Sequence, residues 1–195
     1  MKSMMKDAAI LLVITLCAGL ILGFVYQLTK EPIAAQELKA KMEAYQEVFT
    51  DADSFITLEH AAEEETEKAA VVEGVVAAVD ANNHTLGYVL TITSHEGYGG
   101  DITFTMGIRM DGTLNGISIL AISETPGLGM KAEEVLKPQF AGKVAEQFES
   151  TKTGAVADNQ IDAISGATIT TNAFVNSVNV GLEFFRSELQ EGGTY

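Results

Sequence analysis

Hydroxyl-bearing and glycine residues are concentrated just before the last helical pattern of the chain. They form the run Asp162-Ala163-Ile164-Ser165-Gly166-Ala167-Thr168-Ile169-Thr170-Thr171. The first N–H groups of a helix lack internal partners and carry the positive end of its dipole, so a phosphate is bound there without any lysine. Gly166 lets a backbone approach a ligand closely, and Ala167 adds almost no bulk. These residue types predict an anion site at the start of a helix.

The same hydroxyls also have a simpler explanation. Any one of Ser165, Thr168, Thr170 and Thr171 would cap the helix, which is what most serines and threonines at such positions do. The helix itself is indicated by apolar residues at three- and four-residue steps, namely Phe174, Val178, Leu182, Phe185 and Leu189. Local chemistry alone therefore leaves both a capped helix and an anion site open.

Two further glycine-rich turns lie upstream of this run. The first is Gly97-Tyr98-Gly99-Gly100, which on its spacing alone favours a simple strand connection. The second is Glu124-Thr125-Pro126-Gly127-Leu128-Gly129, where proline followed by glycine predicts a tight turn. Its two glycines around Leu128 would let backbone amides lie close to a flat ligand while the leucine packs on it.

The run at residues 162–168, Asp-x-x-Ser-Gly-Ala-Thr, resembles the flavinylation motif of the FMN-binding domain family. That family includes the G subunit of the Rnf complex and the C subunit of the sodium-pumping NADH:quinone reductase. In it, a separate flavin transferase joins FMN through a phosphoester to the motif's last threonine, which here is Thr168. Asp162 stands at the position of the family's aspartate, whereas Ala163 replaces a glycine found in many members. The glycine-tyrosine loop and the Glu-Thr-Pro-Gly-Leu-Gly turn are similar to loops that line the isoalloxazine ring.

The resemblance implies a covalently held FMN and assigns residues to it. Near the phosphate it places Ser165, Gly166, Ala167, Thr170 and Thr171, with Asp162 in the same motif. Beside the ring it places Glu124, Thr125, Gly127, Leu128, Gly129, Tyr98 and Gly99. Lys131 is a candidate for favouring anionic flavin, although a lysine at a helix start more often faces solvent. No catalytic side chain is expected, because the cofactor itself carries the electrons.

Charge and composition exclude several classes of protein. The net charge is -15, and only 12 Lys and Arg residues are scattered through 195 positions, which argues against nucleic acid as a partner. Cys17 is the single cysteine and lies in an apolar run, so no intrachain disulfide is expected. His60, His84 and His95 are far apart in sequence, and no metal site is predicted.

The N-terminal part predicts a retained membrane anchor. No charged residue occurs at positions 8–29, a length that spans a bilayer and exceeds the apolar core of a cleavable signal peptide. Lys2 and Lys6 precede the run, while Lys30 and Glu31 cancel after it, so we expect a cytoplasmic N-terminus. The globular part would then lie on the extracytoplasmic side of the membrane.

We expect three segments. Residues 1–29 would form the cytoplasmic tip and transmembrane anchor and residues 30–69 a juxtamembrane helix and an acidic loop, and the resemblance implies that residues 70–195 form the FMN-binding domain. Pro32 would lie just inside the juxtamembrane helix, where its missing N–H has no cost. The apolar stripe of this helix consists of Leu38, Met42, Tyr45 and Phe49.

The middle of the chain changes to a β pattern. We predict strands at 71–79, 85–94, 101–109 and 114–123, with Asp111-Gly112 as a type I′ hairpin between the last two. Helices are expected at 132–136 and 140–148. The fold class is therefore α+β, with a single transmembrane helix before one domain whose curved antiparallel sheet is flanked by helices. No Gly-x-Gly-x-x-Gly or Walker sequence supports nicotinamide or ATP binding by those routes.

The resemblance implies an electron-transfer subunit of a membrane-bound Rnf-type complex. Such a complex couples ferredoxin oxidation and NAD⁺ reduction to Na⁺ or H⁺ translocation. Its partners would be the other subunits and, during maturation, the flavin transferase. The compact chain favours the Rnf protein over its counterpart in the quinone reductase. The alternatives are a free-standing extracytoplasmic FMN shuttle and, from another class, a membrane-anchored scaffold domain in which the threonine motif only caps a helix.

Overall fold

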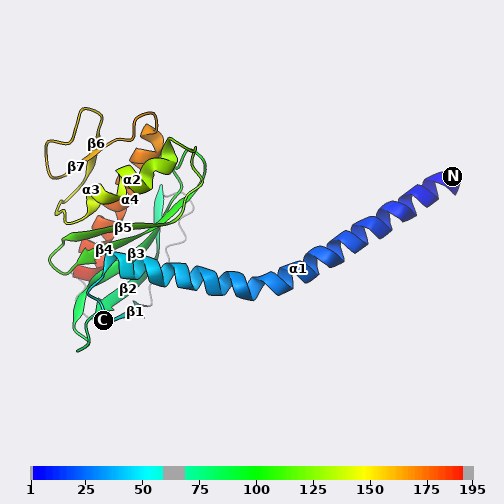
Figure 1. The fold of residues 1–195 in the computed structure, drawn as a ribbon, viewed down its shortest axis with the longest axis horizontal. Coiled ribbons are helices and arrows are strands. Elements are labelled where there is room, and N and C mark those ends of the chain that lie inside the picture. Colours follow the sequence, from blue (N-terminus) through cyan, green and yellow to red (C-terminus); the bar gives the residue numbers. More distant parts are fainter. Residues whose placement is uncertain (1, 59–68, 191–195) are drawn as a thin grey trace. The chain divides into compact units, whose positions relative to one another are not determined.

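The computed structural model describes residues 2–58 and 69–190. The chain divides into two units, Met1–Lys41 and Met42–Tyr195. The first unit consists of the greater part of one helix, and the second contains an antiparallel sheet with helices (Figure 1). This confirms the α+β class. The predicted acidic loop at 61–68, together with His60, lies outside the described residues.

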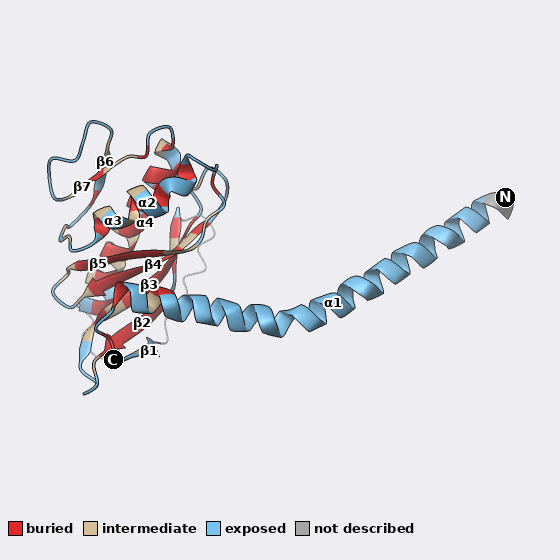
Figure 2. Ribbon diagram, in the orientation of Figure 1, coloured by how far each residue is buried: buried red, intermediate tan, exposed pale blue. Residues whose placement is uncertain are grey.

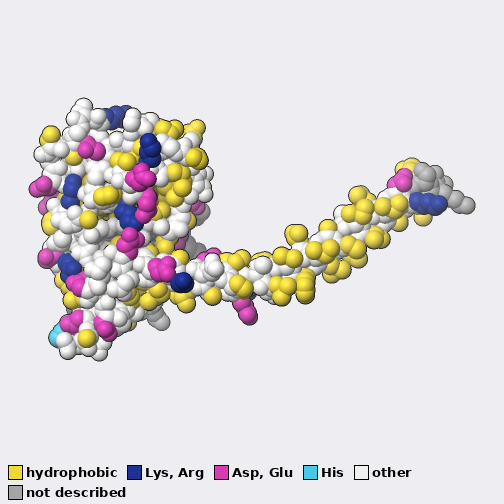
Figure 3. All heavy atoms as spheres, viewed as in Figure 1, with side chains coloured by type: hydrophobic (Ala, Val, Ile, Leu, Met, Phe, Trp, Pro, Cys, Tyr) yellow, Lys and Arg dark blue, Asp and Glu magenta, His cyan; other side chains and the backbone are white. Residues whose placement is uncertain are grey.

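Helix α1 spans Lys2–Val48 and is long and apolar enough to cross a membrane. Apolar side chains cover much of its length (Figure 3). The predicted break into two helices is wrong, because Pro32 lies inside α1. A proline removes only one hydrogen bond of the helix, and good helix formers at Ala34, Ala35 and Gln36 follow within the next turn.

The end of α1 packs on the sheet within the second unit. Val48 and Phe49 are buried with Val76, Ala78 and Val89 of the sheet in a small apolar cluster. Of the apolar stripe predicted for the juxtamembrane helix, only Tyr45 and Phe49 pack against the sheet. Leu38 is 64% exposed and Met42 is 44% exposed.

Five strands form a meander in which each strand pairs antiparallel with the next, in the order β1-β2-β3-β4-β5. Their bounds are Ser54–Leu58, Ala70–Val79, Thr85–Ser94, Ile102–Arg109 and Leu114–Ala121. The four predicted strands are confirmed to within two residues at each end, whereas β1 was not predicted. The inner strands are buried on both faces (Figure 2).

The β4–β5 connection is a hairpin, as predicted, but it is not of type I′. That turn needs positive φ at both central residues, and among the residues of this loop only Gly112 has it, at 84°. The Gly112 N–H donates to the Arg109 carbonyl at 2.9 Å, so Met110 and Asp111 form the turn and Gly112 closes it. Asp111 instead accepts a hydrogen bond from the Thr113 N–H at 2.9 Å.

Short helices follow the sheet. Residues Gly129–Lys131 form a 3₁₀ turn, η1, which continues into α2 at Ala132–Val135 and α3 at Lys137–Phe140. The predicted helix at 140–148 is wrong. Ala141 is extended and Gly142 has a φ of 73°, so the chain turns away and Lys143 bridges to Leu114 of β5. Strands β6 (Glu149–Thr151) and β7 (Gln160–Asp162) form a parallel pair that was not predicted.

Helix α4 spans Thr168–Phe184 and continues into a π-helical segment, η2, at Phe185–Gln190. The predicted apolar stripe of this helix is confirmed, since all five of its residues are buried: Phe174, Val178, Leu182, Phe185 and Leu189. They join the main core with Leu90, Ile92, Phe104 and Met106 of the sheet. Helix α4 is thereby held firmly, and its first residue is Thr168.

Candidate functional site

The threonine run begins with a turn that leads from β7 into α4. The Ala167 N–H donates to the Ile164 carbonyl at 3.0 Å, and Gly166 has a φ of 80°. That backbone conformation favours glycine. The helix starts directly after this turn, so the turn geometry and the core packing of α4 together fix the position of Thr168.

The three threonines of the run occupy different environments. Thr168 is the first residue of α4 and is partly exposed, whereas Thr170 and Thr171 are 1% and 0% exposed. The Thr171 hydroxyl donates to the Ala167 carbonyl at 2.9 Å and accepts from the Ile164 N–H at 3.1 Å. Thr171 therefore holds the turn against the helix, and only Thr168 offers a reachable hydroxyl.

The start of α4 has no side-chain cap. Its N-cap residue is Ala167, and the first N–H to bond back into the helix is that of Thr171, which donates to the Ala167 carbonyl at 3.0 Å. Helix geometry leaves the preceding amide groups, those of Thr168, Ile169 and Thr170, without intrahelical acceptors. These donors, next to the exposed Ser165 and Gly166, form a surface on which a phosphate would be bound.

The Glu-Thr-Pro-Gly-Leu-Gly segment packs against this turn. The Leu128 N–H donates to the Thr125 carbonyl at 3.1 Å, and Gly127 has a φ of 77°, which gives the predicted tight turn. A Cβ atom on Gly166 would lie 3.1 Å from Cδ2 of Leu128. Leu128 nevertheless remains 40% exposed, so it lies over the threonine turn and still faces solvent.

Glu124 joins the three predicted motifs. Its side chain is only 6% exposed, and Oε1 accepts a hydrogen bond from the Gly99 N–H at 3.3 Å. A Cβ atom on Gly129 would lie 2.8 Å from Glu124 Oε2 and 2.8 Å from Thr170 Oγ1. The carboxylate therefore lies where the glycine loop, the turn and helix α4 meet, and Gly129 has no room for a side chain.

The glycine loop at 97–100 is tied to its neighbours by backbone contact. A Cβ atom on Gly99 would lie 2.0 Å from the Ser123 carbonyl oxygen, so the loop and the start of the turn touch directly. Glu96, just before the loop, accepts a hydrogen bond from Asn176 of α4 at 2.8 Å. Tyr98 is 70% exposed on the loop. Lys131 is also exposed, at the end of η1.

Asp162 lies at the end of β7, and the structure shows a contact there that the sequence did not predict. The Asp162 N–H donates to Gln139 Oε1 at 2.7 Å, and Gln139 Nε2 donates to the Asp162 carbonyl at 3.1 Å. One side-chain amide on α3 thus holds the backbone that leads into the threonine run. No local sequence signal marks Gln139, because the contact depends on the tertiary packing of α3 against β7.

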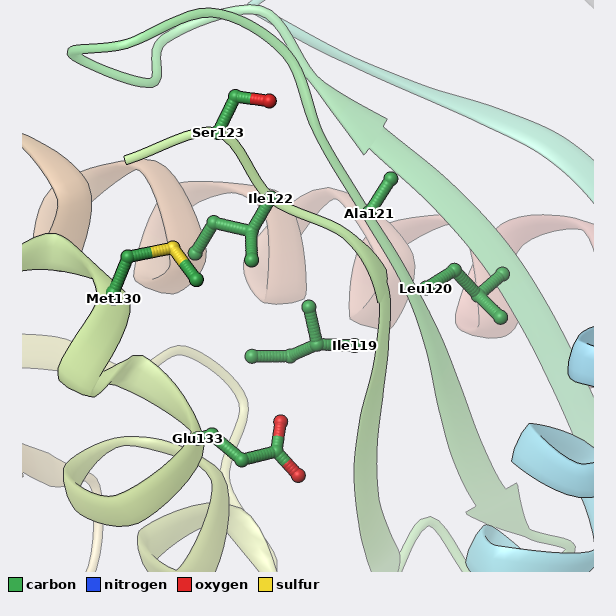
Figure 4. A pocket seen from close by; sticks show the side chains of 7 residues that line it. All are labelled: Ile119, Leu120, Ala121, Ile122, Ser123, Met130 and Glu133. Carbon is green, nitrogen blue, oxygen red and sulfur yellow. The ribbon is translucent and has the colours of Figure 1, made fainter. Parts of the chain in front are cut away.

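A pocket of about 470 Å³ lies beside the turn (Figure 4). We call it the β5 pocket. Ser123 and Met130, which flank the turn on its two sides, belong to its lining, and the other lining residues are Ile119, Leu120, Ala121, Ile122 and Glu133. Its volume is within the range of small-molecule sites, and its lining is mainly apolar. No sequence motif marks Met130 or Glu133 as a site residue.

The residues present fit an FMN group. Amide donors and hydroxyls at the start of α4 suit its phosphate, the exposed Leu128 suits the face of a ring, and the β5 pocket beside the turn has a mainly apolar lining. Among the described residues, no group of three or more His, Cys, Asp or Glu side chains is arranged to hold a metal ion.

Comparison with known proteins identifies the class. Residues 97–183 match the family model described as the FMN-binding domain, and residues 1–48 match the RnfG N-terminal region. The crystal structure of Shewanella oneidensis NqrC is similar in fold, with a TM-score of 0.50 and 19% identity over 71% of this chain and 70% of that one. Fold and matched regions together define an FMN-binding domain behind an N-terminal apolar helix.

Relatives that match over most of their length identify the family to which this FMN-binding protein belongs. The chain is 31% identical to the G subunit of the Na⁺-translocating ferredoxin:NAD⁺ oxidoreductase complex of Acetobacterium woodii, over 95% of this chain and 93% of that protein. It is 29% identical to the proton-translocating counterpart of Clostridium ljungdahlii, over 85% and 83%. It is 26% identical to the G subunit of the ion-translocating oxidoreductase complex of Aliivibrio fischeri strain ES114, over 98% and 94%. The chain belongs to the family of G subunits of Rnf-type ion-translocating oxidoreductase complexes.

Proposed function

We propose that this chain is the FMN-carrying electron-transfer subunit of a membrane-bound ferredoxin:NAD⁺ oxidoreductase, and that a phosphoester joins its FMN to Thr168. The relatives from A. woodii and C. ljungdahlii are named for that oxidoreductase, one with Na⁺ and one with protons as the translocated ion. The coupling ion of this chain is therefore Na⁺ or H⁺. Its partners are the other subunits of the complex and, during maturation, a flavin transferase.

The observation that carries the covalent assignment is the unequal exposure of the three threonines. A transferase must reach the hydroxyl that it modifies, and Thr170 and Thr171 are 1% and 0% exposed. Thr168 is partly exposed, caps nothing, and stands beside amide donors suited to a phosphate. The competing explanation of a capping threonine is not favoured, because the N-cap of α4 is Ala167 and no side chain caps it.

When bound, FMN supplies the electron transfer, and the protein supplies position and electrostatics. The amide groups at the start of α4 would bind the phosphate and offset its charge. Leu128 and the β5 pocket would shield the ring from water, and Glu124 holds the surrounding loops together. A covalent bond prevents loss of the cofactor on a side of the membrane where free FMN is scarce.

The proposed orientation places the N-terminus in the cytoplasm and the FMN domain outside it. Lys2 and Lys6 on the N-terminal side of the apolar part of α1 support this, by the bias of basic residues toward the cytoplasm. Residues 8–29 contain no ionisable group other than Cys17 and Tyr26, so the helix acts as an anchor and offers no ion path.

The test uses the full chain produced together with its flavin transferase. Ultraviolet fluorescence of the denatured protein in a gel reports covalent flavin. We expect a fluorescent band for the native sequence and none for Thr168→Ala. Thr153→Ala is the matched control, because it removes an exposed threonine hydroxyl outside the run at 162–171, and its band should stay fluorescent. A fluorescent Thr168→Ala band, or a dark native band, contradicts the proposal.

Membership of the complex is tested separately by purification in mild detergent. The proposed subunit should copurify with polytopic membrane proteins and iron–sulfur proteins. A flavinylated chain that purifies alone would instead indicate a free-standing FMN shuttle, and a chain without flavin would indicate a scaffold domain.

A further inference from the structure

Three charged side chains from three helices meet beside the β5 pocket. Lys137 of α3 forms an ion pair with Glu47 of α1, with 2.6 Å between Nζ and Oε1, and a second ion pair with Glu133 of α2. Glu47 also accepts a hydrogen bond from the Ser118 hydroxyl of β5. Glu133 lines the pocket, and Figure 4 shows its carboxylate turned toward Ile119. One ammonium group thus connects the end of the anchor helix to the pocket wall.

Burial distinguishes the central lysine from its partners. The Lys137 side chain is 20% exposed, whereas those of Glu47 and Glu133 are 48% and 54% exposed. Burial alone would lower the pKa of Lys137, but the hydrogen bonds and charges of Glu133 and Glu47 outweigh it and raise the pKa. Lys137 is therefore charged at neutral pH, and its position determines where the Glu133 carboxylate lies.

We propose that Lys137 is a positioning residue that holds the Glu133 carboxylate at the β5 pocket and thereby sets the reduction potential of the flavin. This inference rests on the proposed function. It requires that the flavin ring of an FMN attached to Thr168 extends past Leu128 toward the β5 pocket. The protein tunes a flavin through the charges near its ring. Glu133 is the charged residue among those that line this pocket.

The sign of each effect follows from the charges. Adding electrons to a flavin makes it more negative unless protons follow, so a nearby carboxylate opposes reduction. The three side chains together carry one net negative charge. Replacing Glu133 by glutamine removes that excess and should raise the potential. Replacing Lys137 by methionine leaves two unbalanced carboxylates and should lower it.

The size of the effect is modest. At roughly 10 Å from the flavin ring and an effective dielectric constant of about 20, one unit charge changes the equilibrium constant of flavin reduction by about tenfold. Solvent screening of the half-exposed Glu133 reduces this to about threefold to tenfold. For a two-electron couple, tenfold corresponds to about 30 mV. The shift should become smaller as the salt concentration rises.

The experiment is a redox titration of the flavin absorbance in the full chain, purified in detergent after production with the transferase. Five variants are compared with the native sequence: E133Q, K137M, K137R, E134Q and the double variant E133Q/K137M. Glu134 is the matched control, since it is exposed on the same helix and is not part of the pocket lining. In-gel fluorescence first establishes that each protein carries covalent flavin.

We expect E133Q to raise the potential and K137M to lower it, each by about threefold to tenfold in the equilibrium constant. K137R keeps the positive charge and should have a reduction potential close to the native value, as should the double variant. E134Q should shift the potential less than E133Q does. Equal shifts in E133Q and E134Q, or an unchanged potential in flavin-loaded K137M, overturn this inference alone. A native protein without covalent flavin overturns the proposed function and this inference together.

A second measurement does not depend on the flavin. Thermal unfolding of protein made without the transferase should show a coupling between Glu133 and Lys137 in a double-mutant cycle. If the effects of E133Q and K137M on the unfolding temperature are simply additive, the two side chains do not hold each other and the positioning role is wrong.

Discussion

The two faces of the five-stranded sheet are covered in different ways. On the inner face, α4 packs through large apolar side chains, and Phe174 lies 5.3 Å from Phe104 between ring centroids. The opposite face, which we call the outer face as opposed to the inner face under α4, is covered by the end of α1. The helix packs there through a smaller apolar cluster that includes Phe49. That face also carries polar ties, among them the Asn115 amide, which donates to the Val48 carbonyl at 2.9 Å.

This difference indicates which parts of the protein must stay rigid. The inner face fixes α4 and hence Thr168, so its packing should control both stability and cofactor attachment. The outer face packs against the end of α1, so its contacts should affect stability while leaving the threonine turn in place. Variants on the two faces should therefore differ in their effects on stability and on flavin attachment.

Truncation of one buried phenylalanine on each face compares them most directly. Phe174→Ala should reduce the free energy of unfolding by about 3–5 kcal/mol, because it leaves a cavity in the main core. Phe49→Ala should cost less, about 2–4 kcal/mol, since a smaller cluster collapses more easily. Chemical denaturation of the detergent-solubilised chain measures both.

Flavin attachment gives the same pair of variants a second readout. In-gel fluorescence should fall in Phe174→Ala and persist in Phe49→Ala. If Phe49→Ala loses its covalent flavin while Phe174→Ala keeps it, the division between the two faces is wrong.

A methyl group on the glycine loop should disturb the protein more than one at Gly74 in β2. In Gly99→Ala the new Cβ would lie 2.0 Å from the Ser123 carbonyl oxygen, so the backbone must shift, at a cost of about 1–3 kcal/mol. Gly74→Ala is the control, because nothing lies within 4 Å of its Cβ, and it should cost nothing. Unfolding midpoints check both, and similar losses in the two variants would contradict this contact.

Ser177 places a polar group in the core on the inner face of the sheet. Its hydroxyl is fully buried on α4 and finds no hydrogen-bond partner among the residues that the structure describes. Removing an unsatisfied buried hydroxyl gains free energy, so Ser177→Ala should stabilise the protein by up to about 1 kcal/mol. A lower melting temperature for this variant would show that the hydroxyl does have a partner in solution.

Glu47 should give the outer face a weak dependence on pH. Burial alone would raise the pKa of Glu47, but Lys137 and Ser118 outweigh it and lower the pKa in the folded state. Its stabilising contribution is therefore complete above the unfolded pKa of about 4.5 and is lost as the pH falls through the lower, folded pKa. Because the side chain is half exposed, the contribution should stay below about 1 kcal/mol.

Unfolding of the native chain and of Glu47→Gln between about pH 6 and pH 3 measures this contribution. The native chain should have a higher free energy of unfolding than Glu47→Gln at about pH 6, and this difference should disappear toward about pH 3. An advantage that instead grows as the pH falls would contradict the assigned direction of the pKa.

The sequence predicted the features that depend on local pattern. Strands β2 to β5 and the apolar face of α4 follow from periodicity, and the two glycine-containing turns follow from Pro126-Gly127 and Gly166. What it did not predict depends on tertiary contact. Strand β1 forms because its backbone pairs with β2, and the expected helix at 140–148 is replaced by a turn at Gly142 and a bridge to β5.

The candidate site shows the same limit. Motif resemblance selected Thr168, Glu124 and Leu128, but it gave no sign that Glu124 is buried between the three loops or that Thr171 is engaged in holding the turn. Gln139 and Glu133 were missed altogether, because their positions depend on how α2 and α3 pack against β7 and β5.

The covalent bond between FMN and Thr168 is tested most directly by the intact mass of the denatured chain after production with its flavin transferase, followed by mapping of the modified peptide. We expect an increase equal to one FMN less one water, located on Thr168 and absent from Thr168→Ala. A flavin-loaded preparation with an unmodified Thr168, or with the added mass on another residue, would show that Thr168 is not the attachment site.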